Sequence, residues 1–413
     1  MKLSEELQLR GFVGQFSAES LSEILDNEKH TVYHGIDPSA DSAHVGNFVV
    51  WMLLRHLIKD GHKVIFLVGG GTGMIGDPKP DKERPLSEEG EVKARVEKIK
   101  HQAETILGGE PIEFANNYHW LAETNLLTFL RDIGKHFTVN ELIKKDAIAT
   151  RLNSETGLSY TEFAYPLLQA FDYLTLYREK GCTLQVGGTD QWGNIISGVD
   201  LIRRVERATV HALTAPIIVD KTTGKKFGKS EGNAVWLDAE KTSPYAFYQF
   251  WFNVADENVV GYLKLFTMLP LSEIAEIESG LVNNPGTREA QKRLAKEVTA
   301  LVHGEEIALE VEKVSACLFG EVKITSLDQA ELKTLLENAP VTEAADKTML
   351  VDVLVLGGLA TSKREARTFI ESGAVAISGE KINEVGYVLD KDKLGDLVHL
   401  QRGKKNICLI KIN

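Results

Sequence analysis

Three neighbouring segments near the N-terminus alternate between strand-like and helix-like sequence, and this order restricts the fold more than any other feature of the chain. TVYHGI (31–36) is a short β-type run, and FVVWMLLRHLIKDG (48–61) is apolar on most of its faces, as in a buried helix. KVIFLVGG (63–70) is a continuous apolar run of the kind found in parallel sheets. A strand, a helix and a strand with short links favour a βαβ unit, whose two strands are parallel.

Two later apolar runs extend this pattern. TLQVGG (183–188) and APIIVD (215–220) are predicted as further strands between helical stretches. We therefore expect an α/β domain with a parallel sheet over residues 1–220.

The rest of the chain divides by composition and periodicity. Beyond Ser243 the pattern becomes helical, for example in REAQKRLAKEVTALVHG (288–304), which predicts an α-helical domain over 221–320. The stretch 321–347 is polar and interrupted by proline, which is typical of a linker, here with one short helix. Residues 348–413 are predicted as a small α+β domain, with a helix pair before strands in AVAISGEKI and LVHLQRGKKNICLIKI.

Charge argues against a protein that coats nucleic acid without specificity. The chain holds 47 Lys and Arg against 59 Asp and Glu, a formal net charge of −12. The charge is uneven, because residues 348–413 carry +2 and residues 1–347 carry −14. A mildly basic tail on an acidic body indicates that one part of the molecule meets a polyanion.

Cysteine use and hydropathy indicate the compartment. The three cysteines, Cys182, Cys317 and Cys408, are widely spaced without a CxxC pair, so neither a disulfide framework nor a cysteine zinc site is expected. No apolar run approaches the roughly 18 residues that span a bilayer, and the start MKLSEELQLRGF carries acids where a signal peptide is apolar. We expect a cytoplasmic protein with no membrane contact.

One glycine motif suggests a dinucleotide-binding oxidoreductase, but its context argues against that function. Residues 71–76, GTGMIG, match GxGxxG directly after a predicted strand. Asp77, Pro78, Lys79 and Pro80 follow at once, and the two prolines prevent the helix that this fingerprint requires. A glycine-rich turn that lets the backbone approach a ligand is the favoured interpretation.

Two further motifs occur in one predicted sheet. HVGN (44–47) begins the 48–61 helix, where free N–H groups and the helix dipole favour phosphate, and its histidine can donate to phosphate oxygens. KFGKS (226–230) follows a predicted strand, and its two lysines can meet a triphosphate as charge develops on a departing pyrophosphate. A histidine beside a helix cap and a solvated basic loop are the structural alternatives. The two motifs together are much more specific than either alone.

A polar stripe on an otherwise apolar helix predicts a pocket wall. If YTEFAYPLLQAFDYLTLY (160–177) is helical, Tyr165, Gln169 and Asp172 fall on one side and large apolar residues on the other. A solvent-exposed face is the alternative, but such faces are usually built from Lys and Glu. Polar groups that converge in an apolar setting are typical of a ligand site.

HVGN and KFGKS resemble the HIGH and KMSKS signatures of class I aminoacyl-tRNA synthetases. YHGIDPSADSAHVGN, GGGTGMIGDP, FANNYHW, YTEFAYPLLQAFDYL, LQVGGTDQWGNI and KFGKSEGNAVWL resemble, in order, the blocks of the bacterial-type tyrosyl-tRNA synthetase family. The resemblance covers essentially the whole chain and implies a Rossmann-like catalytic domain. It also implies a tyrosine–tRNA ligase that forms tyrosyl adenylate and pyrophosphate from L-tyrosine and ATP, with Mg²⁺ carried by ATP, and then charges tRNA(Tyr).

The resemblance also assigns roles to residues, with no protein-held metal. The tyrosine-binding residues would be Tyr33, Asp77, Asn117, Tyr165, Gln169, Asp172 and Gln185. The ATP-binding residues would be Gly35, Asp37, Ser39, His44, Asn47, Gly187, Gly188, Asp190, Gln191, Lys226 and Lys229. The catalytic residues would be His44, Asn47, Lys226, Lys229 and Ser230.

Two positions depart from the family pattern. Asn47 replaces the second histidine of the signature, and it can donate to a ribose oxygen but cannot carry charge. His34 stands where many relatives have cysteine. Whether Lys82 or Arg84 reaches the triphosphate is open.

The tail and one insertion imply two macromolecular partners. SKREARTFIESGAVAISGEKI resembles an S-four-type RNA-binding domain, and Lys363, Arg364 and Arg367 are spaced to share one helix face that can meet a tRNA backbone. A solvated helix face is the alternative. The family resemblance implies a homodimer, with its interface in an apolar insertion at about residues 120–160.

Three competing functions are each compatible with some of these sequence motifs. Tryptophanyl-tRNA synthetase shares both signatures, but Tyr33, Asp172 and the RNA-binding tail argue against it. An adenylyltransferase that never meets tRNA would not need the tail. A non-catalytic RNA-binding descendant would be expected to lose the phosphate lysines, and both are present.

Overall fold

The computed structural model divides the chain into two compact units. It describes residues 1–77, 87–108, 112–153, 157–224, 227, 229–230, 233–320, 322–403 and 406–413. Unit 1 comprises Met1–Thr242 and Val254–Ala290, and unit 2 comprises Ser243–Asn253 and Gln291–Asn413. The region expected to be one helical domain, 221–320, is therefore shared between the units.

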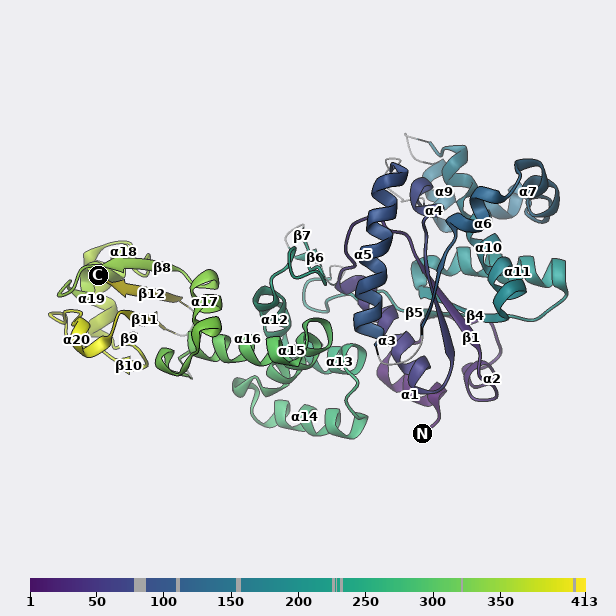
Figure 1. Cartoon of the computed structure of the whole chain (residues 1–413). Helices are drawn as coiled ribbons and strands as arrows, with labels where there is room; N and C mark the ends of the chain where they lie inside the picture. Colours follow the sequence, from purple (N-terminus) through teal and green to yellow (C-terminus); the bar gives the residue numbers. More distant parts are fainter. Residues whose placement is uncertain are drawn as a thin grey trace. The chain divides into compact units, whose positions relative to one another are not determined.

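A five-stranded parallel sheet forms the centre of unit 1 (Figure 1). Its strands are β1 (Thr31–Ile36), β2 (Lys63–Val68), β3 (Glu113–Asn116), β4 (Cys182–Gly188) and β5 (His211–Ala215). The spatial order is β3-β2-β1-β4-β5, so the direction of winding reverses between β1 and β4. In open α/β sheets ligands bind at such a switch point, outside the carboxyl ends of the strands. The α/β prediction and the βαβ unit are confirmed.

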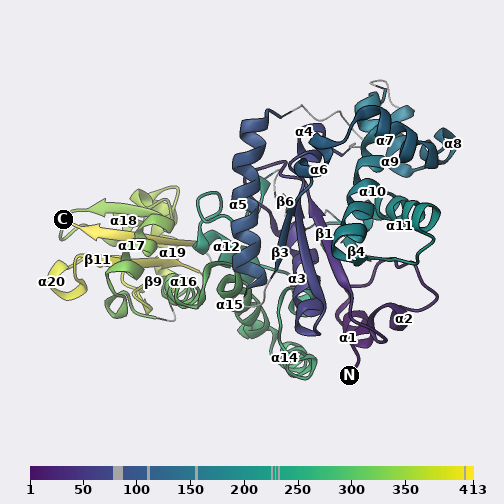
Figure 2. The same cartoon turned by 45° about the vertical axis from the view of Figure 1, so that its right-hand side comes forward.

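Helices cover both faces of this sheet (Figure 2). On one side lie α3 (Val45–Lys59) and α5 (Glu89–Leu107), and on the other lie α10 (Tyr160–Lys180) and α11 (Trp192–Glu206). A capping box between Ser159 and Glu162 begins α10, and Gly181 in the left-handed conformation ends it, so the predicted helix forms despite Pro166.

The predicted strand at 215–220 is wrong. The strand β5 ends at Ala215, five residues earlier than expected. Pro216 follows directly, and it has no N–H to donate to the ladder, so the sheet pairing ends there. Ile217 and Val219 are consequently 38% and 48% exposed rather than part of the sheet core.

Short elements complete unit 1. The insertion between β3 and α10 holds α6 (Tyr118–Glu123), α7 (Leu126–Asp132), η1 (Gly134–His136), α8 (Val139–Leu142) and α9 (Asp146–Leu152). The others are α1 (Leu3–Arg10), α2 (Leu21–Leu25), α4 (Thr72–Ile75), η2 (Thr189–Gln191), β6 (Lys229–Ser230), β7 (Asn233–Ala234), α13 (Asp256–Phe266), α14 (Leu271–Asn283) and η3 (Pro285–Thr287).

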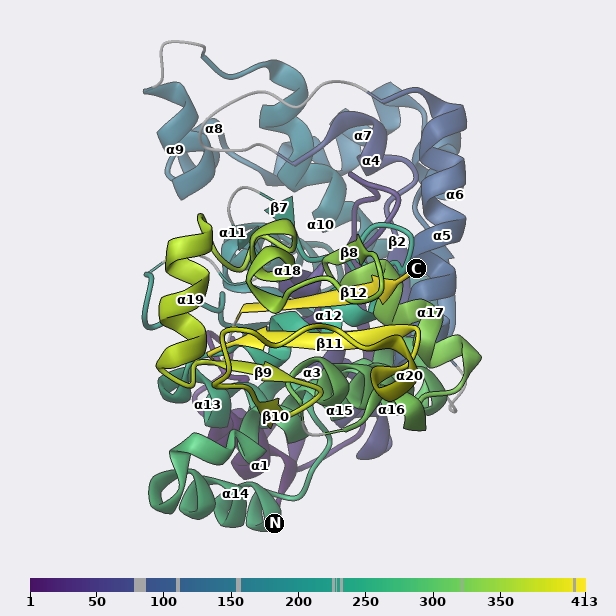
Figure 3. The same cartoon turned by 90° about the vertical axis from the view of Figure 1, so that its left-hand side faces the viewer.

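Unit 2 combines helices with a second sheet. Its helices are α12 (Pro244–Phe252), α15 (Glu289–His303, which begins at the unit boundary), α16 (Glu305–Leu318), η4 (Ile324–Ser326), α17 (Gln329–Asn338), α18 (Leu350–Leu356), α19 (Lys363–Glu371) and α20 (Lys391–Leu394). Its strands are β8 (Val341–Ala344), β9 (Val375–Ile377), β10 (Glu380–Lys381), β11 (Leu397–Arg402) and β12 (Asn406–Ile412), in the order β10-β9-β11-β12-β8 (Figure 3). Leu350, Leu354, Ile370 and Val375 are fully buried in the core that α18 and α19 form with this sheet.

The segment expected to be a linker, 321–347, contributes more structure than predicted. It holds η4 and α17, and its strand β8 pairs in parallel with β12 at the edge of the sheet. Polar composition indicated a linker here, but an edge strand needs only a few residues and can face solvent on one side.

Two findings bear on the expected environment of the chain. Cys182, Cys317 and Cys408 are buried, unpaired thiols. Across the described ranges, the structure holds no helix with the length and apolar character needed to cross a bilayer.

Candidate active site

A cavity of about 890 Å³ opens where the winding of the unit 1 sheet reverses. Gly35 and Asp37 reach it from the end of β1, and Gly187 and Gly188 reach it from the end of β4. The polar stripe of α10 faces it as predicted, because Tyr165, Gln169 and Asp172 all line the cavity. Ser39, His44, Gly46, Asn47, Asp77, Gln185, Asp190 and Gln191 also line it.

Asp172 lies at the buried end of the cavity, where two side chains donate to its carboxylate. Asn117 Nδ2 donates to Oδ2 at 2.9 Å, and Trp120 Nε1 donates to Oδ1 at 2.7 Å. Burial raises the pKa of Asp172 to about 7, and the charge of Asp37 adds to the rise, whereas the hydrogen bonds from Asn117 and Trp120 oppose it. Asn117 is fully buried and acts from behind Asp172 rather than from the cavity wall.

Tyr33 and Gln185 present polar atoms beside Asp172. The two residues are partners across β1 and β4, and each is at most 2% exposed. Among the described residues, neither Tyr33 Oη nor Gln185 Oε1 has a hydrogen-bond partner. Burial first, and then the charge of Asp172, raise the pKa of Tyr33, whereas the neighbouring Gln185 side chain opposes the rise, so the Tyr33 hydroxyl remains a donor. Buried polar atoms are nearly always satisfied, so this pair is suited to a ligand with its own donor and acceptor.

A second carboxylate links α10 to the turn after β2. Asp37 Oδ2 accepts from Tyr165 Oη at 2.6 Å, and its Oδ1 accepts from Thr72 Oγ1 at 2.7 Å. Asp77 accepts from Gln191 Nε2 at 2.9 Å and from Asn194 Nδ2 at 3.0 Å. Both carboxylates line the cavity, so a cationic group of a ligand can approach them there.

The glycine-rich turn after β2 lets neighbouring side chains approach its backbone closely. A Cβ on Gly69 would lie 2.2 Å from Asp37 Oδ1, and a Cβ on Gly70 would lie 2.2 Å from Asn116 Oδ1. The helix α4 that follows has four residues and ends at Gly76, whose φ is +85°. This geometry supports the turn interpretation and removes the long helix that a dinucleotide fingerprint needs.

The HVGN motif forms the N-terminus of α3. His44 Nδ1 accepts from the Gly46 N–H at 3.0 Å, and the His44 N–H donates to Asn47 Oδ1 at 3.2 Å. A Cβ on Gly46 would lie 2.7 Å from His44 Cε1, so glycine lets the ring lie over the backbone. Because Nδ1 accepts, the neutral ring carries its proton on Nε2, which can donate to a ligand. The side-chain oxygen of Asn47, Oδ1, already accepts the His44 N–H as part of the helix cap.

The family of the chain follows from sequence comparison. A model of the tRNA synthetases class I (W and Y) family matches residues 25–320. The chain belongs to this family. A model of the tyrosine–tRNA ligase SYY-like C-terminal domain matches residues 331–410 of the same class I synthetase.

Individual relatives agree along the full length. This class I synthetase is 49% identical over 417 residues to tyrosine–tRNA ligase 2 of Enterococcus faecalis, covering 98% of each chain. It is 45% identical over 418 residues to the tyrosine–tRNA ligase of Leuconostoc mesenteroides, covering 100% of each.

Solved structures confirm the architecture. A C-terminally truncated Aspergillus nidulans mitochondrial tyrosyl-tRNA synthetase matches with a TM-score of 0.70 and 30% identity, over 77% of this chain and 94% of that one. A tryptophanyl-tRNA synthetase from Encephalitozoon cuniculi shares the fold, with a TM-score of 0.56 and 14% identity over 81% of this chain and 92% of that one.

Several predicted residues of the class I synthetase fall outside the site as described. Lys82, Arg84 and Lys226 lie outside the described residues, and of Lys229 and Ser230 only the backbone is described, in β6. Lys363, Arg364 and Arg367 are exposed on α19 of unit 2, where Lys363 Nζ pairs with Asp352 Oδ1 at 2.6 Å.

The structure also gives a place to residues that sequence reasoning missed or only noted. Trp120 and Thr72 were not predicted as site residues, although each lies in a block that carries the family resemblance. His34 Nδ1 lies 3.2 Å from the Val186 carbonyl, and burial lowers the pKa of His34 to about 4. It is therefore a neutral part of the cavity wall.

Proposed function

We propose that the chain is a tyrosine–tRNA ligase. It joins L-tyrosine to ATP, giving tyrosyl adenylate and pyrophosphate, and then transfers the tyrosyl group to the 3′-terminal ribose of tRNA(Tyr). The full-length similarity to tyrosine–tRNA ligases and the family match support this function.

The observation that carries the amino-acid assignment is the set of three polar groups at the buried end of the cavity. The phenol of tyrosine donates to Asp172, whose other contacts are the donors Asn117 and Trp120. Tyr33 Oη and Gln185 Oε1 supply a further donor and acceptor. Phenylalanine would leave these buried groups unpaired, and that costs about 1–3 kcal/mol per group. The ammonium group of the substrate lies towards Asp77, Tyr165 and Gln169.

The phosphate end combines a helix N-terminus with the lysines of KFGKS. His44 Nε2–H and the dipole of α3 attract the phosphates, and Lys226, Lys229 and Ser230 act on the same groups. Gly35, Asp37, Ser39, Asn47, Gly187, Gly188, Asp190 and Gln191 surround the ribose and the reacting carboxylate. Mg²⁺ arrives with ATP as part of the substrate, since it usually binds through the phosphates with few protein ligands.

The chemistry is positioning and charge stabilisation. A carboxylate oxygen of tyrosine attacks the α-phosphorus in line, the bond to the β-phosphate oxygen breaks, and pyrophosphate takes the electron pair. The ribose hydroxyl oxygen of tRNA then attacks the tyrosyl carbonyl carbon, and the bond from that carbon to the phosphate oxygen breaks. AMP leaves with the electron pair, and the hydroxyl proton passes to a phosphate oxygen of AMP. The carboxylate is already ionised, so the first step needs no general base, and the cations act where charge develops on the leaving group.

Amino-acid-dependent ATP–pyrophosphate exchange tests this function directly. Exchange is measured with each of the twenty amino acids in turn, with tryptophan as the decisive competitor because its indole N–H can also donate to Asp172. Exchange with tyrosine alone is the expected result. Exchange with tryptophan would favour the other branch of the family, and none at all would leave RNA binding as the remaining function.

The tRNA contact is assigned to α19. Its exposed Lys363, Arg364 and Arg367 can neutralise phosphates, and residues 348–413 form the RNA-binding part of the chain. The double variant Lys363→Ala with Arg364→Ala should weaken tRNA binding and flatten its salt dependence while exchange is unchanged. Equal loss of both activities would contradict this division.

The chain is a cytoplasmic homodimer in this proposal. The insertion exposes Leu126 at 68%, Leu127 at 75% and Leu130 at 43%, and such apolar patches usually mark an interface. Light scattering should give twice the chain mass of 45.7 kDa. The buried free thiols agree with a reducing compartment.

A further inference from the structure

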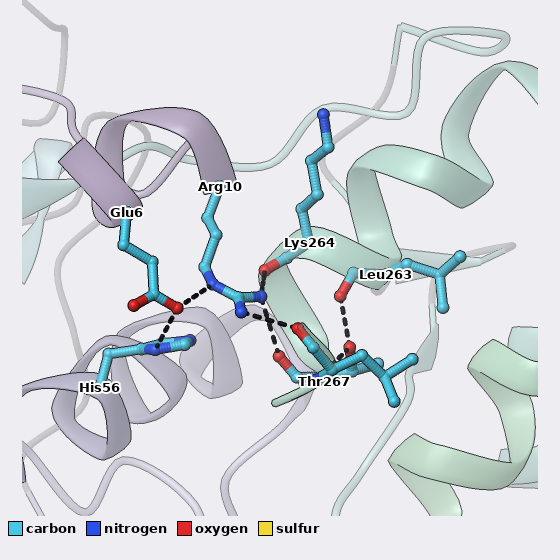
Figure 4. A network of polar contacts seen from close by, with 7 residues as sticks. Glu6, Arg10, His56, Leu263, Lys264 and Thr267 are labelled. Atoms are coloured by element: carbon cyan, nitrogen blue, oxygen red, sulfur yellow. Dashed lines mark hydrogen bonds and ion pairs between the residues drawn. The ribbon is translucent and has the colours of Figure 1, made fainter. Parts of the chain in front are cut away.

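Arg10, the last residue of α1, is a buried cation that joins segments far apart in the sequence. It is 3% exposed, and all three of its guanidinium nitrogens donate hydrogen bonds (Figure 4). Nε donates to Glu6 Oε1 at 2.8 Å, and Nη2 donates to the Leu269 carbonyl at 2.7 Å. Nη1 donates to the carbonyls of Lys264 at 3.2 Å and Thr267 at 3.5 Å.

Of these carbonyls, that of Lys264 lies in the last turn of α13, that of Thr267 belongs to the C-cap residue, and that of Leu269 follows two residues later. The last carbonyls of a helix lack intrahelical partners, and a positive charge beside them complements the helix dipole. The Thr267 hydroxyl donates to Leu263 at 2.6 Å, and Arg10 satisfies Lys264, Thr267 and Leu269, so the helix ends on a side chain from α1 rather than on glycine. A buried charge with this many partners leaves several of them unpaired when it is removed.

Glu6, the acidic partner of Arg10, also lies close to His56 of α3. His56 Nδ1 lies 3.6 Å from Glu6 Oε1, and the His56 ring packs against Phe12 with 5.3 Å between ring centroids. Burial, with added effect from nearby cations including Arg10, lowers the pKa of His56 to about 3, so the ring is neutral. His56 therefore adds no charge to the ion pair that Glu6 forms with Arg10.

The same helix α13 holds an aromatic residue of the second signature. Phe227, the second residue of KFGKS, has its ring centroid 4.4 Å from Tyr262 and 5.5 Å from Phe266. These two residues are one turn apart on α13 and so share a face. Phe266 also stacks on Phe48 of α3, at 5.7 Å with an interplanar angle of 22°. Phe48 is the residue that follows HVGN.

A second attachment lies at the start of α13. Asn258 is 1% exposed, and its Oδ1 accepts from the Lys221 N–H at 3.1 Å. Its Nδ2 donates to Asp220 Oδ2 at 3.3 Å and to Thr222 Oγ1 at 3.4 Å. The helix therefore holds the chain at both 220–222 and Phe227, before and within the second signature.

We propose that Arg10 is a positioning residue for adenylate formation, which locks α13 in place and so fixes Phe227 relative to the helix that begins at His44. The inference rests on the proposed function. Arg10 touches no substrate in it and acts through α13. The competing explanation is that Arg10 only stabilises the fold.

Kinetics of Arg10→Met and Arg10→Lys separate these explanations. Methionine keeps much of the length and apolar packing without donors, whereas lysine keeps the charge and can satisfy some carbonyls. We expect Arg10→Met to lower kcat/KM for ATP in pyrophosphate exchange about 10- to 100-fold, because a displacement of about 1 Å far from the chemistry can cost that much. The tyrosine dissociation constant should stay within about twofold, since Asp172 and Tyr33 lie on other elements. Arg10→Lys should recover part of the rate.

A double-mutant cycle with Phe227→Leu tests the route. If Arg10 acts through Phe227, the double variant should lose hardly more rate than the worse single variant. If the rate loss of the double variant equals the product of the two single losses, Arg10 does not act through Phe227. Tyrosine affinity and rate that fall together, in step with thermal stability, would show that Arg10 is only structural.

Arg55→Met is the matched control. Arg55 Nη1 also donates to a carbonyl in the last turn of a helix, that of Ile106 in α5, whereas the rings described against Phe227 belong to α13. Arg55→Met should lower thermal stability without a selective fall in kcat/KM for ATP. If Arg10→Met does not fold, Tyr262→Leu takes its place in the cycle and should give the same ATP-selective loss, and its absence would overturn the proposal. A wild-type chain without tyrosine-dependent exchange would instead refute the proposed function.

Discussion

At the buried end of the cavity the polar groups come from the interiors of two strands and a helix, whereas at the proposed phosphate end His44 and Asn47 come from the first residues of a helix. Tyr33, Gln185 and Asp172 are each at most 3% exposed and cannot move without moving β1, β4 or α10. His44 and Asn47 are held by hydrogen bonds between neighbours in the sequence. The first end is therefore suited to select a substrate, and the second to stabilise charge on a group that leaves.

The variant Asp172→Ala should cause the largest loss of activity with tyrosine. It removes the acceptor for the substrate phenol and leaves the donors of Asn117 and Trp120 unpaired, so kcat/KM for tyrosine should fall on the order of a thousandfold. Pyrophosphate exchange over a range of tyrosine concentrations measures this. Asp200→Ala removes a half-exposed carboxylate that pairs with Arg203, and it should leave exchange unchanged. A loss below tenfold for Asp172→Ala would show that the phenol is bound elsewhere.

The variant His44→Ala should lower the rate of adenylate formation without changing the selection of tyrosine. Removal of one donor to developing charge usually costs about a hundredfold in kcat. The tyrosine dissociation constant should not change, because His44 lies at the other end of the cavity. His101→Ala, whose side chain is 83% exposed on α5, is the control. A parallel loss of tyrosine affinity would mean that the two ends are not separable.

The pH dependence of tyrosine binding sharpens the comparison. Burial raises the pKa of Asp172 to about 7, so the carboxylate that we propose as the acceptor for the phenol is present above pH 7 and is lost as the pH falls below it. Tyrosine affinity should therefore decrease from pH 8 to pH 6, by up to about tenfold per pH unit. Equilibrium binding without ATP tests this, since neither the ammonium group nor the phenol of the ligand titrates there. A flat profile would place the pKa of Asp172 elsewhere.

The two ends also differ in how well the sequence predicts them. HVGN and KFGKS are local patterns, so the phosphate end is recognised from a few adjacent residues. The stripe of Tyr165, Gln169 and Asp172 is predictable because helical periodicity sets which side chains share a face. The contacts of Trp120 and Thr72 are not, because they join residues 52 and 35 positions away from them.

The fold shows the same division between local and long-range information. The βαβ unit follows from apolar periodicity within 31–70, and the structure confirms it. The predicted strand 215–220 shares only Ala215 with β5, because the apolar run used to predict it continues past Pro216, which cannot pair. The strand β8 was missed because its four residues gain their role only from pairing with β12, more than sixty positions away.

The smallest expected effect concerns Asn47, where a cap and a substrate contact can be separated. Asn47 Oδ1 accepts the His44 N–H, and a lost cap of this kind costs about 1 kcal/mol. Asn47→Asp keeps the acceptor and loses the amide donor, whereas Asn47→Ala loses both. If the amide donates to ribose, both variants should raise KM for ATP a fewfold, about 1 kcal/mol for one neutral hydrogen bond, and only Asn47→Ala should also lower thermal stability. Normal ATP kinetics in Asn47→Asp would show that Asn47 serves the helix alone, and that the phosphate end depends on one histidine and the lysines.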